Sequence, residues 1–385
     1  MPVGWMRKGD WQRMTPPERN GTSAAPADLA DNASAEARPG LTVRRGHGRT
    51  IHFLAWPLLA FAALLVFNFL FTPGFFRIEI RDGRFFGSLI DVMNRGAPVV
   101  LLAMGMTLVI ATGGIDLSVG AIMAITGAVA AGLIARPSYS WLSAVDLHGV
   151  IPLIVAAALV VSVAAGAWNG FLVARLDIQP IVATLILMVA GRGIAQLITS
   201  GQIITFENPA FEFLGSGFLF HLPVPIAIAL AILAVTAIGT RTTALGLFIE
   251  AVGNNPTASY YAGISARRVK MIAYTFCGLC SGIAGLIVTA DIKGADANNA
   301  GLYTELDAIL AVAMGGTSLA GGRFTLIGSL IGALLIQTLT TTILTRGIPP
   351  AMTLVVKAAV VIAVCLLQSE RFRTLLTKRN RSGIP

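Results

Sequence analysis

The sequence contains few charged residues, three cysteines and four histidines. Only 12% of its 385 residues are charged, whereas 55% are hydrophobic. A chain with so little polar surface cannot enclose a water-soluble core, and its apolar runs are long enough to cross a bilayer. All three cysteines fall inside apolar segments, so no disulfide framework is expected. The sequence therefore predicts an all-α protein, a polytopic bundle of transmembrane helices.

Catalytic and nucleotide-binding patterns are also missing. The sequence has no G-x-x-x-x-G-K-[ST] motif, so it cannot hold nucleotide phosphates through a P-loop. It shows no paired carboxylates, no nucleophile beside a base and no histidine pair with metal-ligand spacing. We therefore expect no catalytic residue, and no metal or cofactor bound by this chain.

A long apolar region lies between two polar ends. Residues 1–50 contain eight basic residues and several prolines, which predicts a disordered tail. Residues 51–368 form the predicted membrane domain, which includes a loop at 240–270, and residues 369–385 form a second tail. Ten spans are expected, at residues 53–71, 92–112, 115–135, 150–174, 178–199, 223–239, 271–290, 306–319, 324–344 and 352–367.

The distribution of lysine and arginine orients this bundle. Basic residues concentrate in the loop at 240–270 and in the last seventeen residues. Because cytoplasmic loops carry the basic excess, we expect both to face the cytoplasm. With ten spans the N-terminus lies there too, which puts nineteen of the 28 basic residues inside and seven outside. The predicted location is the inner (plasma) membrane, with both termini cytoplasmic.

One segment of the membrane domain occurs twice. Shifting the chain by 202 positions lays Leu310 to Ile336 over Leu108 to Ile134. Gly113 and Gly114 of the first copy match Gly315 and Gly316 of the second. Two spans joined at a glycine break, repeated in the same orientation, are typical of transporters. The breaks predict tight helical hairpins or single broken helices, surrounded by protein or by a water-filled cavity.

The sequence of the loop at 240–270 predicts regular secondary structure. Residues 244–251 predict a short, partly apolar helix, followed by a turn at 253–256 and a second short helix through residue 262. An apolar helix facing water either packs beneath the protein's own helices or binds a partner. The residues alone leave both interpretations open.

Three motifs carry a family resemblance. The pattern Glu250-Ala251-x-Gly253-x-Asn255, followed by Gly263, resembles the coupling loop of ABC importer permeases. The string GGIDLSVGA at 113–121 is similar to the hallmark of ribose-type sugar importer permeases. Strings at 82–99, 179–198 and 291–316 resemble one branch of that family, the galactofuranose importer permeases. The likeness covers residues 73–368 and not the first fifty.

This resemblance implies a permease subunit that moves a sugar by alternating access. It would pair with a second permease subunit, identical or different. It would bind an ATP-binding subunit, which holds ATP and Mg, and receive sugar from a periplasmic binding protein. The residues of the implied ATPase contact are Glu250, Ala251, Gly253, Asn254, Asn255 and Gly263.

Polar residues at membrane depth are candidates for the sugar path or for helix breaks. Asp116 follows the first glycine pair, and structural pinning is favoured over sugar contact. Arg192 needs a partner in the membrane, for which Asp116 or Asp177 is the structural choice and path lining the functional one. Lys357 is assigned no role, since a lysine can reach an interface. The candidates are Gly113, Gly114, Asp116, Ser118, Asn169, Arg192, Gln196, Gly315 and Gly316.

A loop before the eighth span is dense in hydrogen-bonding groups. It is either solvated, or a gate and docking surface for the binding protein. Its candidates are Asp291, Asp296, Asn298 and Asn299. Glycines at three- and four-residue spacings, including Gly166 and Gly278, are interpreted as close helix packing instead.

Other functions are compatible with parts of this pattern. A ribose-, xylose- or other monosaccharide ABC permease differs only in substrate. An ion-coupled secondary sugar transporter would also have parallel repeats and buried acids. A membrane enzyme or sensor is a further alternative, which the absence of catalytic patterns disfavours.

Overall fold

The computed structural model describes residues 47–81, 84–136, 142 and 150–368. Most of the predicted N-terminal tail and the whole C-terminal tail lie outside the described residues. The first helix begins at His47, inside the segment expected to be a tail. The predicted domain limits are otherwise not tested.

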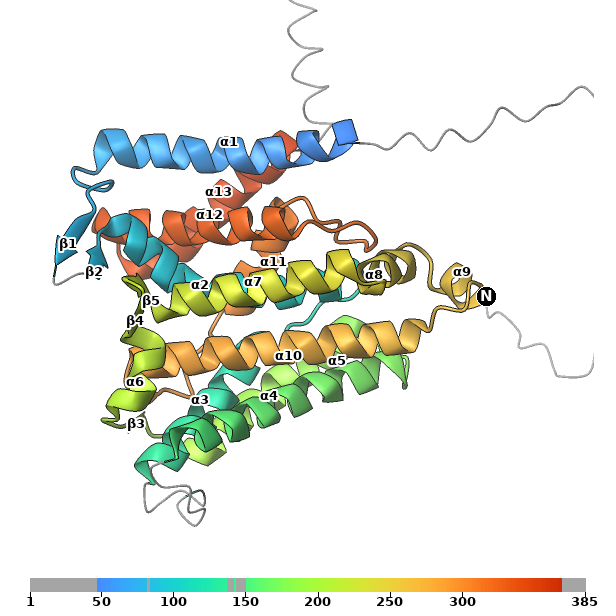
Figure 1. The fold of residues 1–385 in the computed structure, drawn as a ribbon, viewed down its shortest axis with the longest axis horizontal. Helices are drawn as coiled ribbons and strands as arrows, with labels where there is room; N and C mark the ends of the chain where they lie inside the picture. The colour runs from blue at the N-terminus through green and yellow to red at the C-terminus, as the bar shows by residue number, and fades with distance from the viewer. Residues whose placement is uncertain (1–46, 82–83, 137–141, 143–149, 369–385) are drawn as a thin grey trace, which may run out of the picture. The chain divides into compact units, whose positions relative to one another are not determined.

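Ten long helices correspond, in order, to the ten predicted spans within the described residues. Figure 1 shows most of them running in a similar direction across the view, with the last one oblique to the rest. They are α1 His47–Phe71, α2 Ser88–Ala111, α3 Val119–Ala135, α4 Ile151–Ala174, α5 Pro180–Thr199, α7 Val224–Thr242, α10 Ala266–Asp291, α11 Thr304–Met314, α12 Leu326–Thr345 and α13 Pro350–Gln368.

Short helices and strands lie at the ends of this bundle. Three antiparallel strand pairs form: Glu79 pairs with Phe86, Ile204 with Ala295, and Phe218 with Pro223. The elements are α6 Pro209–Ser216, α8 Leu245–Asn254, α9 Pro256–Tyr261, β1 Glu79–Arg81, β2 Arg84–Phe86, β3 Ile204–Thr205, β4 Phe218–Leu219, β5 Leu222–Pro223 and β6 Gly294–Ala295.

The bundle has two distinct ends. In Figure 1, α8 and α9 lie at one end, and the β1–β2 and β4–β5 hairpins with α6 lie at the other. We call these the α8 end and the hairpin end. Because the ten long helices alternate in direction, the start of α1 and the end of α13 both lie at the α8 end. This is the arrangement that the predicted topology requires.

Six of the described helices are individually long and apolar enough to span a bilayer: α2, α4, α5, α7, α10 and α12. Within the residues whose side chains are described, shorter apolar stretches lie at Ala55–Phe71 in α1, Val119–Ala135 in α3 and Met352–Ile362 in α13. The chain is therefore a multi-pass membrane protein, as predicted.

The core is built around α2, in which every residue from Val99 to Ala111 is buried. Helix α10 packs against α2, α3 and α4. Close approach depends on glycine: a Cβ at Gly278 would lie 2.7 Å from the Gly166 Cα. A Cβ at Gly105 would lie 2.8 Å from the Cys277 Cα. The packing interpretation of Gly166 and Gly278 is confirmed.

The hairpin prediction holds for the second glycine break and not for the first. Helices α11 and α12 pack on each other as a hairpin, whereas α3 turns away from α2 and packs against α4, α5 and α10. The eighth span, expected at 306–319, is also shorter than predicted, because α11 ends at Met314. Positive φ angles at Gly113 (+82°) and Gly316 (+84°) end these helices.

Candidate functional site

Asp116 lies at the centre of a buried polar cluster after the first break. Its Oδ1 accepts hydrogen bonds from the Ser118 amide at 2.9 Å and from the Ser118 hydroxyl at 2.6 Å. The Asn169 side-chain amide, on α4, donates to the same oxygen at 3.3 Å and to Ser118 Oγ at 2.7 Å. All three residues are fully buried. This geometry is that of a pin which fixes the unwound segment against α4.

The second break is fixed differently. The Thr325 hydroxyl donates to the Gly315 carbonyl at 2.8 Å, and the Thr325 amide donates to Thr317 Oγ1 at 3.2 Å. Helix α12 crosses here so closely that a Cβ at Gly315 would lie 2.3 Å from the Gly328 carbonyl carbon. The second copy of the repeat thus replaces the buried acid with threonine hydroxyls.

The end of α8 touches both breaks. The Gly322 amide donates to the Ala111 carbonyl at 2.9 Å, which joins the second break to the end of α2. A Cβ at Gly253 would lie 1.9 Å from that same carbonyl oxygen and 2.4 Å from the Gly322 nitrogen. A Cβ at Gly321 would lie 3.0 Å from the Gly113 Cα. Gly253 of the predicted coupling loop and Gly113 of the first break therefore belong to one contact site.

The predicted turn at 253–256 is shorter than expected, because α8 continues through Asn254. Asn255 then begins α9, and its Oδ1 accepts a hydrogen bond from the Ala258 amide at 3.0 Å. Gly263, with a φ of +81°, follows the end of α9. One face of this loop packs beneath the protein's own helices, and another is exposed. Ile249 and Val252 are buried, whereas Tyr260 and Tyr261 are 73% and 84% exposed.

Glu250 lies at the edge of this contact site and is half-buried. Burial raises the pKa of its carboxyl group, while Arg323 and the Phe324 amide act in the opposite direction. Ala251, which precedes the buried Val252, is also half-buried. Glu250 is thus placed beside the second break, with its carboxylate facing a cation from that break.

Arg192 and Gln196 share one face of α5, as their spacing predicts, and both bind the loop before α11. Arg192 Nη1 donates to the carbonyls of Ala297 at 3.1 Å and Ala300 at 2.5 Å. Gln196 Nε2 donates to Asn298 Oδ1 at 2.7 Å. The expectation that Arg192 pairs with Asp116 or Asp177 is wrong, because the loop folds inward and presents its carbonyls.

The loop itself is folded around Asp296. Its Oδ1 accepts from the amides of Asn298 and Asn299 at 2.9 and 3.2 Å, and its Oδ2 accepts from Asn299 Nδ2 at 2.7 Å. The Asn299 side chain is the largest contribution that lowers the pKa of Asp296. The structure thus brings Asp296, Asn298 and Asn299 together with α5, whereas Asp291 lies elsewhere, beside a cavity described below.

Helix α11 crosses only part of the membrane. Its 11 residues span about 16 Å at the α-helical rise of ~1.5 Å per residue, roughly half of a ~30 Å hydrocarbon core. The irregular segment before it must complete the crossing. Part of that segment is buried against α3: a Cβ at Gly120, at the start of α3, would lie 2.2 Å from the Gly301 carbonyl oxygen. The first turns of α3 and α11 therefore meet inside the bundle.

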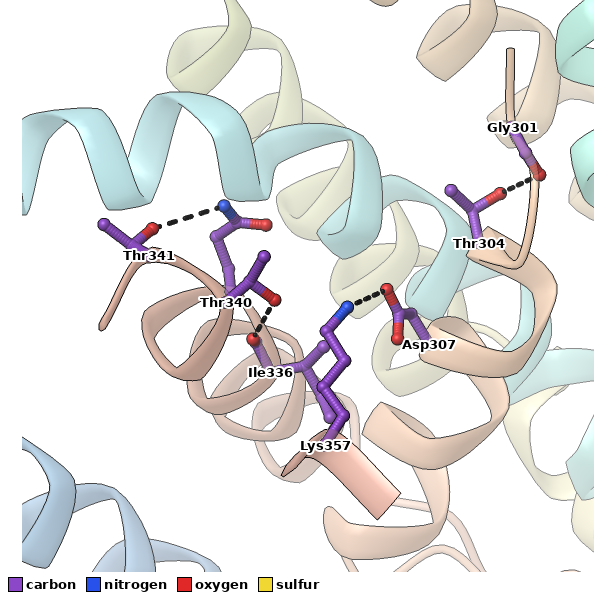
Figure 2. Close-up of polar contacts among 8 residues, drawn as sticks. Gly301, Thr304, Asp307, Ile336, Thr340, Thr341 and Lys357 are labelled. Atoms are coloured by element: carbon purple, nitrogen blue, oxygen red, sulfur yellow. Dashed lines mark hydrogen bonds and ion pairs between the residues drawn. The ribbon is translucent and has the colours of Figure 1, made fainter. Parts of the chain in front are cut away.

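Sequence reasoning missed an ion pair that holds this half-helix. Lys357 Nζ of α13 lies 2.8 Å from Asp307 Oδ2 of α11, and the two side chains are only 12% and 18% exposed. Figure 2 shows the pair between the two helices. The signal was a lysine at membrane depth, which needs a partner. The sequence could not identify Asp307 because the relative register of α11 and α13 is a tertiary property.

At the hairpin end, a second ion pair is exposed. Lys293 Nζ lies 2.8 Å from Glu212 Oε2 of α6. The contact lowers the pKa of Glu212 and raises that of Lys293. Together with the β3–β6 pair, it attaches the loop before α11 to α6.

Comparison with known proteins gives a consistent picture. The family model described as "Branched-chain amino acid transport system / permease component" matches residues 88–365. The chain is 54% identical to the galactofuranose transporter permease protein YtfT of Escherichia coli K12, over 83% of this chain and 92% of the relative.

More distant relatives are also sugar permeases. Identity is 37% to the fructose import permease protein FruF of Bifidobacterium longum, over 85% of this chain and 91% of that protein. It is 33% to the ribose import permease protein RbsC of E. coli K12, over 86% of this chain and the full length of that protein. No solved structure matches the chain.

Proposed function

Because the chain belongs to this family of transport-system permease components, we propose that it carries galactofuranose, or a closely related monosaccharide, across the bilayer as the membrane subunit of an ABC sugar importer. The observation that carries the choice of sugar is the 54% identity to a galactofuranose permease over nearly the whole of both chains. The chain's role is transport, and it performs no chemistry on the sugar.

The contact between α8 and the two breaks supports the mechanism. In this proposal the exposed face of α8 and α9 binds an ATP-hydrolysing subunit, which holds ATP and Mg. Since Gly253 touches both Ala111 and Gly322, a displacement of α8 reaches both copies of the repeat at once. Alternating access then follows from a change in how the two broken segments pack.

The orientation follows from this assignment. The α8 end, with both ends of the described chain, faces the cytoplasm, and the membrane is the inner (plasma) membrane. The hairpin end faces outward and receives sugar from a periplasmic sugar-binding protein. A second permease subunit, identical or different, completes the transporter.

The sugar path in this proposal passes the polar face of α5. Arg192, Gln196 and the loop they hold line it, and the loop acts as the outer gate. Hydrogen bonds from Arg192 to main-chain carbonyls keep the loop closed until α8 moves. Weak, distributed polar contacts suit a path, because tight binding would slow release.

The test is transport by the assembled protein in liposomes. The permease is reconstituted with its ATPase and binding protein, and uptake of labelled D-galactose, which in water contains both ring forms, is followed. We expect uptake to require ATP on the side of the membrane that holds the ATPase. Unlabelled galactose should compete with the labelled sugar more strongly than ribose or fructose does.

One result would contradict the choice of sugar, and another would contradict the ATP-driven mechanism. Stronger competition by ribose or fructose would retain an ABC sugar permease and change its substrate, as the 33% and 37% identical relatives allow. Uptake driven by membrane potential without any ATPase would instead identify an ion-coupled secondary transporter.

A further inference from the structure

A cavity of about 500 Å³ opens within the outer part of the bundle, away from the face of α5. Its walls come from α2, α10 and α12, with α6 and α7 at its edge. Small-molecule sites typically enclose ~300–1,000 Å³, so its size suits a small ligand. From Val99 onward every residue of α2 to its end is buried, so the cavity ends near Pro98.

Hydrogen-bonding groups gather on facing walls of this cavity. Asp91, Asn94 and Arg95 of α2 line one side at i, i+3 and i+4. Gln337 and Thr341 line the opposite side on α12, and Figure 2 shows the hydrogen bond at the Thr341 hydroxyl. Asp291, at the end of α10, forms part of a third wall.

Much of this hydrogen-bonding capacity is not used inside the protein. Asn94 Oδ1 is buried and makes no hydrogen bond within the described part of the chain. Among the residues that the structure describes, the Gln337 amide donates to Thr341 alone, at a long 3.5 Å. Because a polar atom that is buried without a partner is unfavourable, such groups usually have a solvent or ligand partner.

The charges and shape of the walls indicate the class of ligand. Two carboxylates, Asp91 and Asp291, face one guanidinium, Arg95, so the balance is negative and disfavours anions. The walls carry both acceptors and donors, which suits hydroxyl groups that both donate and accept, and apolar residues such as Ile287 and Leu344 line the rest. No aromatic ring lines the cavity among the described residues, so binding by stacking is not available and a ligand would be held weakly.

We propose that this cavity is a subsite for a neutral, hydroxyl-rich sugar on the outer side, within a single permease subunit and separate from the face of α5. The proposal rests on the proposed function for its orientation, because the cavity lies toward the hairpin end. Sugar released by the binding protein occupies it transiently, with Asp91, Asn94 and Gln337 binding its hydroxyls.

The first test measures access and protection. A Thr341→Cys variant in cells is treated from outside with a membrane-impermeant maleimide, with and without D-galactose. The parent chain, with its buried Cys277 and Cys280, gives the background. The control is Met93→Cys, one residue before Asn94 on α2 but outside the cavity lining. We expect Thr341→Cys to react much faster than Met93→Cys, and galactose to slow that reaction at least threefold without changing Met93→Cys.

The second test measures transport in the reconstituted importer. Thr341→Trp fills the cavity and should reduce ATP-driven uptake at least tenfold, whereas Met93→Trp should leave it near normal. Gln337→Leu, of similar size, should raise the KM for uptake severalfold with little change in kcat. This KM effect is not expected of a purely structural role.

The possible failures are distinguishable. Absent ATP-driven uptake by the parent transporter would overturn the proposed function itself. Normal parent uptake, combined with full activity of Thr341→Trp or with labelling that galactose does not slow, would overturn only the subsite. A lipid that co-purifies with the protein and shields Thr341→Cys from labelling would also overturn it, because the cavity would then be a lipid site.

Discussion

Buried polar side chains in this bundle are held by partners that lie far apart in the sequence. Asn169 reaches Asp116 and Ser118 across more than fifty residues, and Asn68 of α1 donates to Thr342 Oγ1 of α12 at 2.8 Å. Each bond is made where water is excluded, so loss of one partner leaves the other unsatisfied. At the residue scale, the function of such groups is to hold helices in one arrangement.

The pin at the first break predicts the effect of Asn169→Ala. The variant leaves Ser118 Oγ and Asp116 Oδ1 without their α4 donor, and we expect a loss of about 1–3 kcal/mol in stability. Thermal unfolding in detergent measures this loss. Ser216→Ala, at an exposed hydroxyl on α6, is the control and should change little. A stability equal to that of the parent would show that the pin is not needed.

The ion pair between α11 and α13 predicts a rescue. Lys357→Ala leaves Asp307 buried without its cation, and breaking such a pair is unfavourable by about 3–5 kcal/mol. Lys357→Asp and Asp307→Lys, each alone, should be at least as unstable, because each places two like charges side by side. The double change Lys357→Asp with Asp307→Lys should recover a large part of the loss in the same unfolding assay. Simple addition of the two single effects would contradict a direct pair.

At the scale of elements, helix α8 is the one that connects the exposed surface with α9 to the two glycine breaks. One face packs on the two breaks, and the other is exposed together with α9. Its contact with α2 is made by main-chain atoms at a glycine. Such a contact has little freedom to adjust, so a small movement of α8 must be passed to its neighbours.

Gly253→Ala tests this contact. The added methyl group would lie 1.9 Å from the Ala111 carbonyl oxygen, which is main chain and cannot rotate away. We expect α8 to shift and uptake to fall at least tenfold, while the ATPase subunit still hydrolyses ATP. Gly239→Ala on α7 is the matched control, because its Cβ would meet no atom within 4 Å. Equal uptake by the two variants would remove α8 from the coupling mechanism.

Glu250→Arg tests the same helix electrostatically. The new side chain places a second cation beside Arg323, where burial already disfavours an unpaired charge. We expect the protein to insert in the membrane but to lose assembly or coupling with the ATPase, as measured by co-purification and ATP-driven uptake. Glu250→Gln, which removes the charge without adding one, should be much milder. Unaltered uptake by Glu250→Arg would refute the assignment of this loop.

For the whole molecule, the alternation of ten helices fixes which segments share an end of the bundle. The coupling helix, the two glycine breaks and both ends of the described chain lie at one end. The three strand pairs and α6 lie at the other. The proposed mechanism requires these two ends to face different compartments.

Cysteine labelling determines which compartment each end faces. An impermeant maleimide should label Asn254→Cys only in inside-out vesicles. Phe220→Cys, at an 88% exposed residue between β4 and β5, should be labelled only in right-side-out vesicles. The reverse pattern would invert the topology and remove the proposed contact with a cytoplasmic ATPase.

The sequence by itself determined the membrane class, the ten long helices, the repeat and the structured loop, because hydrophobic length and glycine position are local properties. It also predicted that Arg192 and Gln196 share a face, since helical periodicity decides this. Only the tertiary structure decided their partners, the Lys357–Asp307 pair, the separation of α3 from α2 and the cavity beside Asp291. These depend on the register and direction in which helices pack across long sequence separations, and a local pattern carries no information about that register.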